Sequence, residues 1–292
     1  MKILIPNFHF FHFRNIAGCL QTIADKSDVQ TFLWEPEQRP IIDVFDEIDP
    51  DVVFIHENQL DAAFNIVSKE FDFKYVLVGS QERDDIEKRP DVVITTSAFQ
   101  QNFSSSDNIV SLLPAAKVTQ VHSGKKEESL ESEVLIITGV VPNTGPVVDS
   151  MRCLSQKFNT KIIGDKPVPL PNYLGKTSIF ERANFIKSSK LLVDFGSYDY
   201  LDAAYLHVPV LFGQDVLDGL GNVKTFNDIP SLLEQTQYLL KNSEEAEEYA
   251  EKMYQHVAGS HTYYHRTSSL FRKMGIKDVA DSLIEFLKEL LK

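Results

Sequence analysis

The hydrophobic positions of this chain fall into short continuous runs that alternate with segments of helical period. In the first part of the chain the runs lie at residues 2–6, 31–34, 51–56, 74–79, 91–96 and 108–114. They are rich in Val and Ile and lack strict alternation, which is typical of parallel strands covered on both faces. Helical patterns at 16–25 and 60–71 separate some of them, so the sequence predicts a doubly wound α/β domain over residues 1–123.

The pattern is interrupted by a polar segment and then begins again. Residues 121–133 (VHSGKKEESLESE) are charged and have no apolar period, so we place a linker at 124–133. After it, strand-like runs at 134–139, 160–164, 190–195 and 208–213 alternate with helical patterns at 146–158, 178–189 and 201–206. This predicts a second Rossmann-like domain over 134–270, with a tail that is nearly all helical from residue 229.

The last predicted helix, over residues 271–292, is amphipathic. Val279, Leu283, Phe286 and Leu290 recur at helical spacing among charged residues of both signs. Such a face favours packing within the chain or a protein contact, including a homodimer contact, over a lipid surface.

Charge and composition narrow the classes of partner. Residues 1–123 contain 10 Lys and Arg against 19 Asp and Glu, whereas residues 134–292 contain 17 against 19. The acidic first domain would repel a phosphate backbone, which argues against a nucleic-acid partner. The nearly neutral second domain can bind a compact anion through local cations. No apolar run reaches eighteen residues and only two cysteines occur, so we expect no membrane span and a cytoplasmic location.

Loops that follow strands supply the first candidate chemistry. The loop TGVVPNTGP (138–146) contains Gly139, Thr144 and Gly145, and Pro146 suits a first helical turn. Small residues there let backbone N–H groups approach a diphosphate at a helix start. An ordinary strand-to-helix turn fits the same spacing.

Two carboxylates lie in the stretch LVDFGSYDYLDAAYLHVPVLFG (192–213). Asp194 ends a strand-like run, and Asp202 stands at the start of an apolar helix. A carboxylate in that place can bind the paired hydroxyls of a ribose, or it can cap the helix. Arg182 and Lys187 precede this strand and are candidate phosphate ligands, as are Lys166 and Lys176. For the lysines, the pattern favours solvated surface positions over a ligand role.

These residues resemble the nucleotide-sugar domain of GT-B glycosyltransferases. Those enzymes often contain a Glu-x7-Glu element followed by a Gly/Pro turn and an apolar strand. Asp194 and Asp202 have that separation, although Asp replaces Glu twice and His207 stands where Gly is usual. The resemblance implies that Asp202 binds the ribose. Asp194 and Tyr198 are further candidates for the same donor site, although Asp194 could simply terminate the strand.

The tail is similar to the CgeB-like, spore-maturation branch of these enzymes. That branch has a His-Thr-Tyr-x-His-Arg element, which is matched by residues 261–266 (HTYYHR), and the resemblance spans roughly residues 75–271. From the residues alone, packing that ties the last helices onto the first domain explains this element as well.

The resemblance implies two tandem Rossmann-like domains that face each other across a cleft. It also implies transfer of a hexose or pentose from a nucleotide-diphosphate sugar to a hydroxyl of a glycan or small molecule, without a metal or other cofactor. Two alternatives are a GT-B-fold sugar-nucleotide epimerase and a non-catalytic nucleotide- or glycan-binding protein.

The first domain would then bind the acceptor. The stretch NFHFFHFRN (7–15) follows its first strand, and Phe8, His12 and Arg14 could pack on or bind an acceptor ring; alternatively, the Phe side chains fill the core. An inverting transferase also needs a general base near the acceptor hydroxyl. The candidates for this base lie near strand ends or in the loops at the same rim, and they are His9, His12, His56, Glu57 and Asp85.

Overall fold

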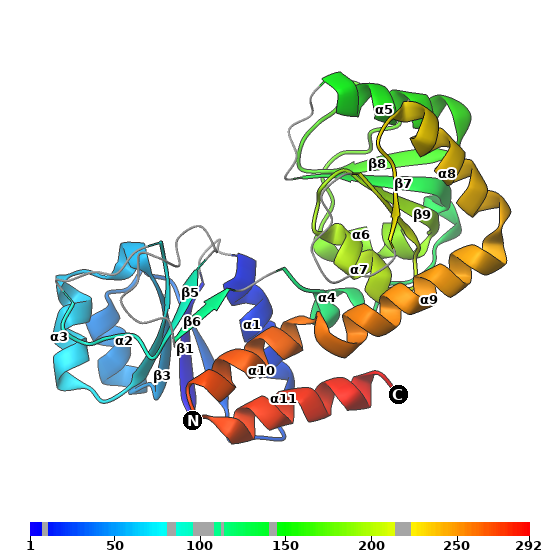
Figure 1. Cartoon of the computed structure of the whole chain (residues 1–292). Coiled ribbons are helices and arrows are strands. Elements are labelled where there is room, and N and C mark those ends of the chain that lie inside the picture. Colours follow the sequence, from blue (N-terminus) through cyan, green and yellow to red (C-terminus); the bar gives the residue numbers. More distant parts are fainter. Residues whose placement is uncertain (8–10, 81–85, 96–107, 112–113, 140–144, 214–222) are drawn as a thin grey trace. The chain divides into compact units, whose positions relative to one another are not determined.

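The computed structural model of the chain describes residues 1–7, 11–80, 86–95, 108–111, 114–139, 145–213 and 223–292 (Figure 1). The chain divides into two compact units. Unit 1 comprises Met1–Leu113 and Tyr263–Lys292, and unit 2 comprises Pro114–Thr262. The polar segment 124–133 therefore lies within unit 2, and residues 263–270 belong to unit 1 instead of the second domain in which we expected them. The reason is that the helix they begin packs on the first helix of the chain.

Unit 1 is built on a parallel sheet. Its strands are β1 (Lys2–Pro6), β2 (Gln30–Trp34), β3 (Val52–His56), β4 (Lys74–Val78), β5 (Val92–Thr95) and β6 (Ile109–Ser111). They are ordered β2-β1-β3-β4-β5-β6. The helices are α1 (Phe11–Thr22), α2 (Ile41–Ile48), α3 (Ala62–Glu70), α10 (Tyr263–Lys273) and α11 (Lys277–Leu290), with a 3₁₀ turn, η1 (Glu57–Gln59).

Helices cover both faces of this sheet (Figure 1). Successive strand side chains point to opposite faces, so Val53 and Ile55 join the core under α2 and α3. Phe54 points the other way, where its ring meets Phe13 of α1 at 6.0 Å and Phe271 of α10 at 6.4 Å. The Val/Ile runs are thus buried on both sides, as the sequence predicts.

The two C-terminal helices complete the α1 face of unit 1. The Tyr264 hydroxyl lies 3.0 Å from Thr22 Oγ1, and the Tyr264 ring stacks on Phe286 at 5.7 Å. Val279 and Leu283 are buried. Packing of the final helix within the chain is therefore confirmed, and a homodimer contact stays a prediction.

Unit 2 repeats the architecture with a smaller parallel sheet. Its strands are β7 (Ser132–Thr138), β8 (Thr160–Gly164), β9 (Ser189–Asp194), β10 (Val210–Phe212) and β11 (Lys224–Thr225), ordered β11-β10-β9-β7-β8. Its helices are α4 (Val118–Val121), η3 (Glu128–Leu130), α5 (Gly145–Lys157), α6 (Ile179–Lys187), α7 (Asp199–Tyr205), α8 (Ile229–Lys241) and α9 (Ser243–Ser260).

The predicted α/β class with two Rossmann-like sheets is confirmed. The sequence did not indicate α2 or the two-residue strand β11. Over the described residues, no helix combines the length and the apolar character that crossing a membrane requires.

Candidate active site

The strand order of each sheet fixes where a ligand would bind. In unit 2, β8 and β9 lie on opposite sides of β7, so the loops that follow β7 and β9 diverge at the carboxyl edge. In unit 1, β2 and β3 flank β1 in the same way. Ligands of open α/β sheets bind at such switch points. These two edges contain most of the candidate residues.

The loop after β7 leads into α5, which begins at Gly145. A helix start there is what the sequence predicts. Gly139 ends the described part of this loop. A Cβ at Gly139 or Gly145 would meet no neighbour within 4 Å. Thr144 lies outside the described residues.

Asp194 closes the turn after β9. Its Oδ1 accepts hydrogen bonds from the Ser197 N–H at 2.9 Å and the Ser197 hydroxyl at 2.5 Å, and its Oδ2 accepts from the Gly196 N–H at 3.1 Å. Burial raises the pKa of this carboxyl to about 6, although these hydrogen bonds act in the opposite direction. The geometry matches a residue that terminates a strand and shapes the following loop.

Asp202 lies in a buried network of four charges. Asp202 Oδ1 accepts from the Lys117 N–H at 2.8 Å, and its Oδ2 lies 2.5 Å from Lys117 Nζ. Lys117 Nζ also lies 3.3 Å from Asp199 Oδ1, to which Arg182 Nη1 donates at 3.0 Å. The positive charges of Lys117 and Arg182 balance the negative charges of Asp199 and Asp202.

The pKa values in this network follow from its pairings. Burial would lower the pKa of Lys117, but Asp202 and Asp199 raise it above its usual value. Burial would raise the pKa of Asp199, but Lys117 and Arg182 hold it below the usual value. Burial keeps the pKa of Asp202 raised. Lys117 is thus a fixed cation in the interior.

Lys117 and Asp199 were missed in the sequence. Asp199 had a signal, because it lies three residues before Asp202 and therefore on the same side of a helix. Lys117 had none, since its partners lie 82 and 85 residues further along the chain.

The surroundings of Asp202 contradict the helix-cap expectation. Helix α7 begins at Asp199 with Tyr198 at its N-cap, so Asp202 lies within the first turn and does not cap the helix. The Asp202 residue is 0% exposed. A direct contact between this carboxylate and a ribose would require displacement of Lys117, and ribose binding by Asp202 stays an untested prediction.

Three other donor candidates occupy different places. Arg182 lies in the first turn of α6, which Ser178 and Glu181 cap reciprocally, and its contact with Asp199 places it at the carboxyl edge. Tyr198 follows β9 at the same edge and is 43% exposed. Lys187 lies at the opposite end of α6, next to the start of β9, and donates to the Leu206 carbonyl at 3.2 Å.

His207 occupies a backbone conformation that favours glycine. Its φ is 59°, in the left-handed region. The His207 N–H donates to the Ala204 carbonyl, and the Val208 N–H donates to the Ala203 carbonyl. This is a Schellman motif with His207 at the position that glycine most often fills. The imidazole stacks on Tyr254 at 3.8 Å, and its Nδ1 lies 3.0 Å from Glu251.

In unit 1 the carboxyl end of β3 brings His56 and Glu57 together with the loop after β4. Glu57 Oε2 accepts from the Ser80 N–H at 2.6 Å and from the Ser80 hydroxyl at 3.0 Å. His56 Nδ1 accepts from the Asn58 N–H at 3.2 Å. The Glu57 carboxylate is thus engaged in holding the loop, and the His56 ring is oriented by its own turn.

The remaining unit 1 candidates are only partly described. Arg14 lies on α1 and is exposed. Phe8, His9 and Asp85 lie outside the described residues, and the side chain of His12 is not described either. Their predicted roles stay predictions.

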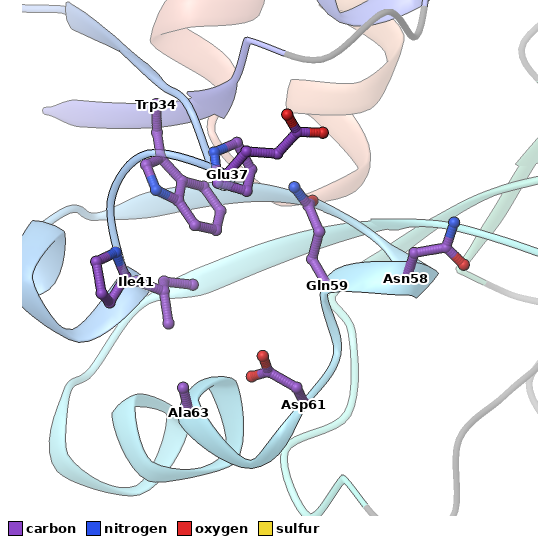
Figure 2. Close-up of a pocket in the computed structure, with 9 residues that line it drawn as sticks. Trp34, Glu37, Ile41, Asn58, Gln59, Asp61 and Ala63 are labelled. Carbon is purple, nitrogen blue, oxygen red and sulfur yellow. The ribbon is translucent and has the colours of Figure 1, made fainter.

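A pocket of about 340 Å³ opens in unit 1 beside the carboxyl ends of β2 and β3 (Figure 2). Residues of four elements line it: the end of β2 with the following loop, the start of α2, η1, and the start of α3. They are Trp34, Pro36, Glu37, Pro40, Ile41, Asn58, Gln59, Asp61 and Ala63. No motif in the sequence indicated this pocket directly, although it adjoins His56 and Glu57 in the chain.

Two further expectations concern the tail and metals. The element at 261–266 spans the return to unit 1: Thr262 pairs with Ala116 in unit 2, and Tyr263 begins α10. Among the described residues, no group of three or more His, Cys, Asp or Glu side chains is placed to hold a metal ion.

Comparisons with known proteins agree with this fold. A family described as glycosyl transferase-like matches residues 215–272. No curated protein sequence matches the chain. Solved structures match over nearly its whole length.

Three of these solved structures resemble the chain at low sequence identity. Sucrose-phosphate synthase from Thermosynechococcus elongatus has a TM-score of 0.58 at 10% identity and covers 100% of this chain and 99% of its own. The spinosyn forosaminyltransferase SpnP has a TM-score of 0.55 at 10% identity, and the match covers 94% of this chain and 99% of SpnP. UDP-GlcNAc 2-epimerase from Neisseria meningitidis, bound to UDP-GlcNAc, has a TM-score of 0.54 at 12% identity. The match covers 99% of this chain and 100% of the epimerase. At these identities the likeness shows the fold, which is the GT-B pair of tandem Rossmann-like units.

Proposed function

We propose that this protein is a glycosyltransferase that moves a sugar from a nucleotide-diphosphate sugar to an acceptor hydroxyl. The observation that carries the proposal is the glycosyl transferase-like match at residues 215–272, on a chain with the GT-B fold. The HTYYHR element favours the CgeB-like branch within that group. Transfer of a hexose or pentose without a metal is part of the proposal.

The donor would bind at the carboxyl edge of the unit 2 sheet. The first turn of α5 at Gly145, with Gly139 and Thr144 before it, offers backbone N–H groups to the diphosphate. Arg182 lies at the same edge and would meet a phosphate only by giving up part of its pairing with Asp199, whereas the exposed Tyr198 ring can pack on the nucleobase or sugar. These groups would stabilise the negative charge that develops on the leaving diphosphate.

The acceptor would bind to unit 1, where the carboxyl edge holds the candidate bases. Of the described candidates, His56 suits the role of base because the Glu57 carboxylate is engaged by Ser80. A retaining reaction would need no such base.

The second candidate function is epimerisation of a sugar nucleotide. It is favoured by the structural likeness to the Neisseria meningitidis epimerase, which is bound to UDP-GlcNAc. An epimerase would use the same donor edge and no separate acceptor.

The test measures binding and turnover of UDP-, GDP-, CMP-, TDP- and ADP-sugars. We expect one of them to raise the melting temperature, and Tyr198→Ala to weaken its binding about tenfold, because Tyr198 is exposed at this edge. Tyr238→Ala is the matched control, because Tyr238 is a similarly exposed tyrosine of unit 2 that lies on α8 and outside the proposed donor site. Release of free nucleotide that depends on an acceptor supports transfer, whereas interconversion of the donor sugar without an acceptor supports epimerisation. If none of these sugar nucleotides binds, both the transferase and the epimerase proposals are overturned.

A further inference from the structure

An exposed salt bridge between Asp165 and Lys176 lies in the segment that connects β8 to α6. Lys176 Nζ lies 3.1 Å from Asp165 Oδ1, and the two side chains are 78% and 53% exposed. An ion pair as exposed as this one contributes little to the stability of a fold. Each of the two groups can therefore exchange the other for a ligand at small cost.

The backbone holds this pair beside the switch point of the unit 2 sheet. The Asp165 N–H donates to the carbonyl of Thr138, the last residue of β7, at 3.1 Å. Gly164, which ends β8, has a φ of 134°, and a Cβ there would lie 1.9 Å from the Thr138 carbonyl oxygen. The Gly164 N–H donates to the Gly175 carbonyl at 3.0 Å, which holds the backbone next to Lys176. The chain thus crosses from the end of β8 to the end of β7, which lies next to β9.

Asp165 also acts on Arg182, the cation in the first turn of α6. Burial would lower the pKa of the Arg182 guanidinium, whereas the carboxylates of Asp199 and Asp165 raise it. Asp199 contacts Arg182 Nη1 at 3.0 Å and follows β9, just as Asp165 follows β8. The charged groups that follow these two strands therefore approach one another at the edge where open α/β sheets bind their ligands.

The other carboxylates at this edge are already engaged. Three of them are at most 7% exposed and accept hydrogen bonds within unit 2: Asp194, Asp199 and Asp202. Glu181 is exposed in the first turn of α6, but it accepts from the Ser178 N–H at 2.8 Å and caps the helix. Among the described residues that follow β7, β8 and β9, Asp165 is thus the exposed carboxylate that is held by a surface lysine alone.

We propose that Asp165 and Lys176 bind the sugar-nucleotide donor together. The Asp165 carboxylate would accept hydrogen bonds from two neighbouring hydroxyls, one on each oxygen. The Lys176 ammonium would pair with the diphosphate. A sugar nucleotide carries both kinds of group, because hydroxyls of the ribose and of the sugar flank its phosphates. Asp165 would then have the role that the family pattern suggests for the buried Asp202. That the ligand is a sugar nucleotide rests on the proposed function.

The test measures the affinity of the intact protein for the UDP-, GDP-, CMP-, TDP- or ADP-sugar that raises its melting temperature. Asp165→Asn should weaken binding about tenfold, because a hydrogen bond to a charged acceptor is lost. Lys176→Met should weaken it about fivefold and reduce its dependence on salt, because the lost contact is with a phosphate.

A second exposed pair supplies the matched controls. Lys126 Nζ lies 3.3 Å from Glu131 Oε1, with side chains 67% and 50% exposed, and Glu131 precedes β7 at the opposite edge of the same sheet. Lys126→Met and Glu131→Gln should leave the affinity unchanged. Because both pairs are exposed, all four variants should keep the melting temperature of the wild type without ligand.

Fragments of the donor identify the hydroxyls that Asp165 binds. The fragments are the nucleoside diphosphate of the same base and its 2′-deoxy form. If the ribose is bound, Asp165→Asn should weaken the nucleoside diphosphate about tenfold and remove its advantage over the 2′-deoxy form. If the hydroxyls belong to the sugar, Asp165→Asn should weaken the sugar nucleotide and leave the nucleoside diphosphate unchanged. Either result supports the proposal.

The outcomes separate this inference from the proposed function. If a sugar nucleotide binds and both Asp165→Asn and Lys176→Met keep wild-type affinity, the inference fails and the transferase proposal stands. If binding depends on Asp165 and Lys176 but the sugar is neither transferred nor epimerised, the inference stands and the proposed function fails. If no sugar nucleotide binds, both are overturned.

Discussion

Lys117 and Asp202 form a doubly bonded pair in the interior of unit 2: the backbone N–H of Lys117 donates to Asp202 Oδ1 at 2.8 Å, and its Nζ lies 2.5 Å from Oδ2. The lysine residue is 4% exposed and the aspartate 0%. The carboxylate that the family resemblance suggests for the donor ribose is thus the anchor of a lysine near the start of unit 2. Loss of ligand binding on removal of Asp202 would not by itself identify a ribose ligand.

Asp202→Ala should therefore destabilise the protein with or without a ligand. It leaves Lys117 buried without its nearest anion, and breaking a buried pair costs about 3–5 kcal/mol. Chemical denaturation of unit 2 measures this. Glu248→Gln, which removes a surface partner of Lys252, should change stability by less than about 1 kcal/mol. A similarly small loss for Asp202→Ala would show that the pair contributes little.

Asp194 should make stability depend on pH in a defined window. Its pKa is raised from 3.8 to about 6 by burial, so the folded state favours the protonated form. The contribution of this group is fully present below about pH 4 and is lost as the pH rises through 6. At 1.36 kcal/mol per pKa unit, the total change is about 3 kcal/mol. Asp194→Asn cannot titrate, so its stability should rise by that amount relative to wild type between pH 4 and pH 7. Urea unfolding across that range, with parallel profiles for the two proteins, would contradict the assignment.

His207 should tolerate glycine better than alanine. At φ 59° a Cβ is strained, whereas glycine adopts this conformation freely. Both substitutions lose the contacts to Tyr254 and Glu251, so the difference between them isolates the backbone. We expect His207→Gly to be about 1 kcal/mol more stable than His207→Ala in thermal unfolding. At the exposed helical position Lys252 the order should reverse, because alanine is the better helix former. If His207→Gly and His207→Ala were equally stable, the backbone strain at position 207 would not contribute to stability, and the prediction would be wrong.

Phe271→Ala should destabilise unit 1 specifically. Phe271 is 0% exposed and its ring meets Phe54 of β3. Truncation of a buried Phe costs about 3–5 kcal/mol. Hydrogen exchange should increase in β3, α1 and α10, while the amides of β7 and β9 keep their protection. Loss of protection mainly in unit 2 would contradict the division of the chain.

The sequence predicted the strands well because buried parallel strands leave continuous Val/Ile runs, as at 52–55 and 134–137. It also placed the candidate chemistry at strand ends, where Asp194, His56 and Glu57 lie. It could not predict the pairing of Lys117 with Asp202, because no local period links residues so distant in the chain. The sequence did not predict the pocket beside Trp34 for the same reason. A loop after β2 and a turn after β3 form this pocket together, and neither segment contains a motif of its own.

The return of residues 263–292 to unit 1 determines the order in which the two units can be completed during synthesis. Unit 2 is continuous, so all of its residues have been made once Thr262 is added. Unit 1 begins first, yet Phe54 and the α1 face wait for α10 and α11, which are synthesised only after unit 2. Unit 1 is therefore completed after unit 2, and until then its uncovered apolar face is exposed in the nascent chain, where such surfaces favour aggregation.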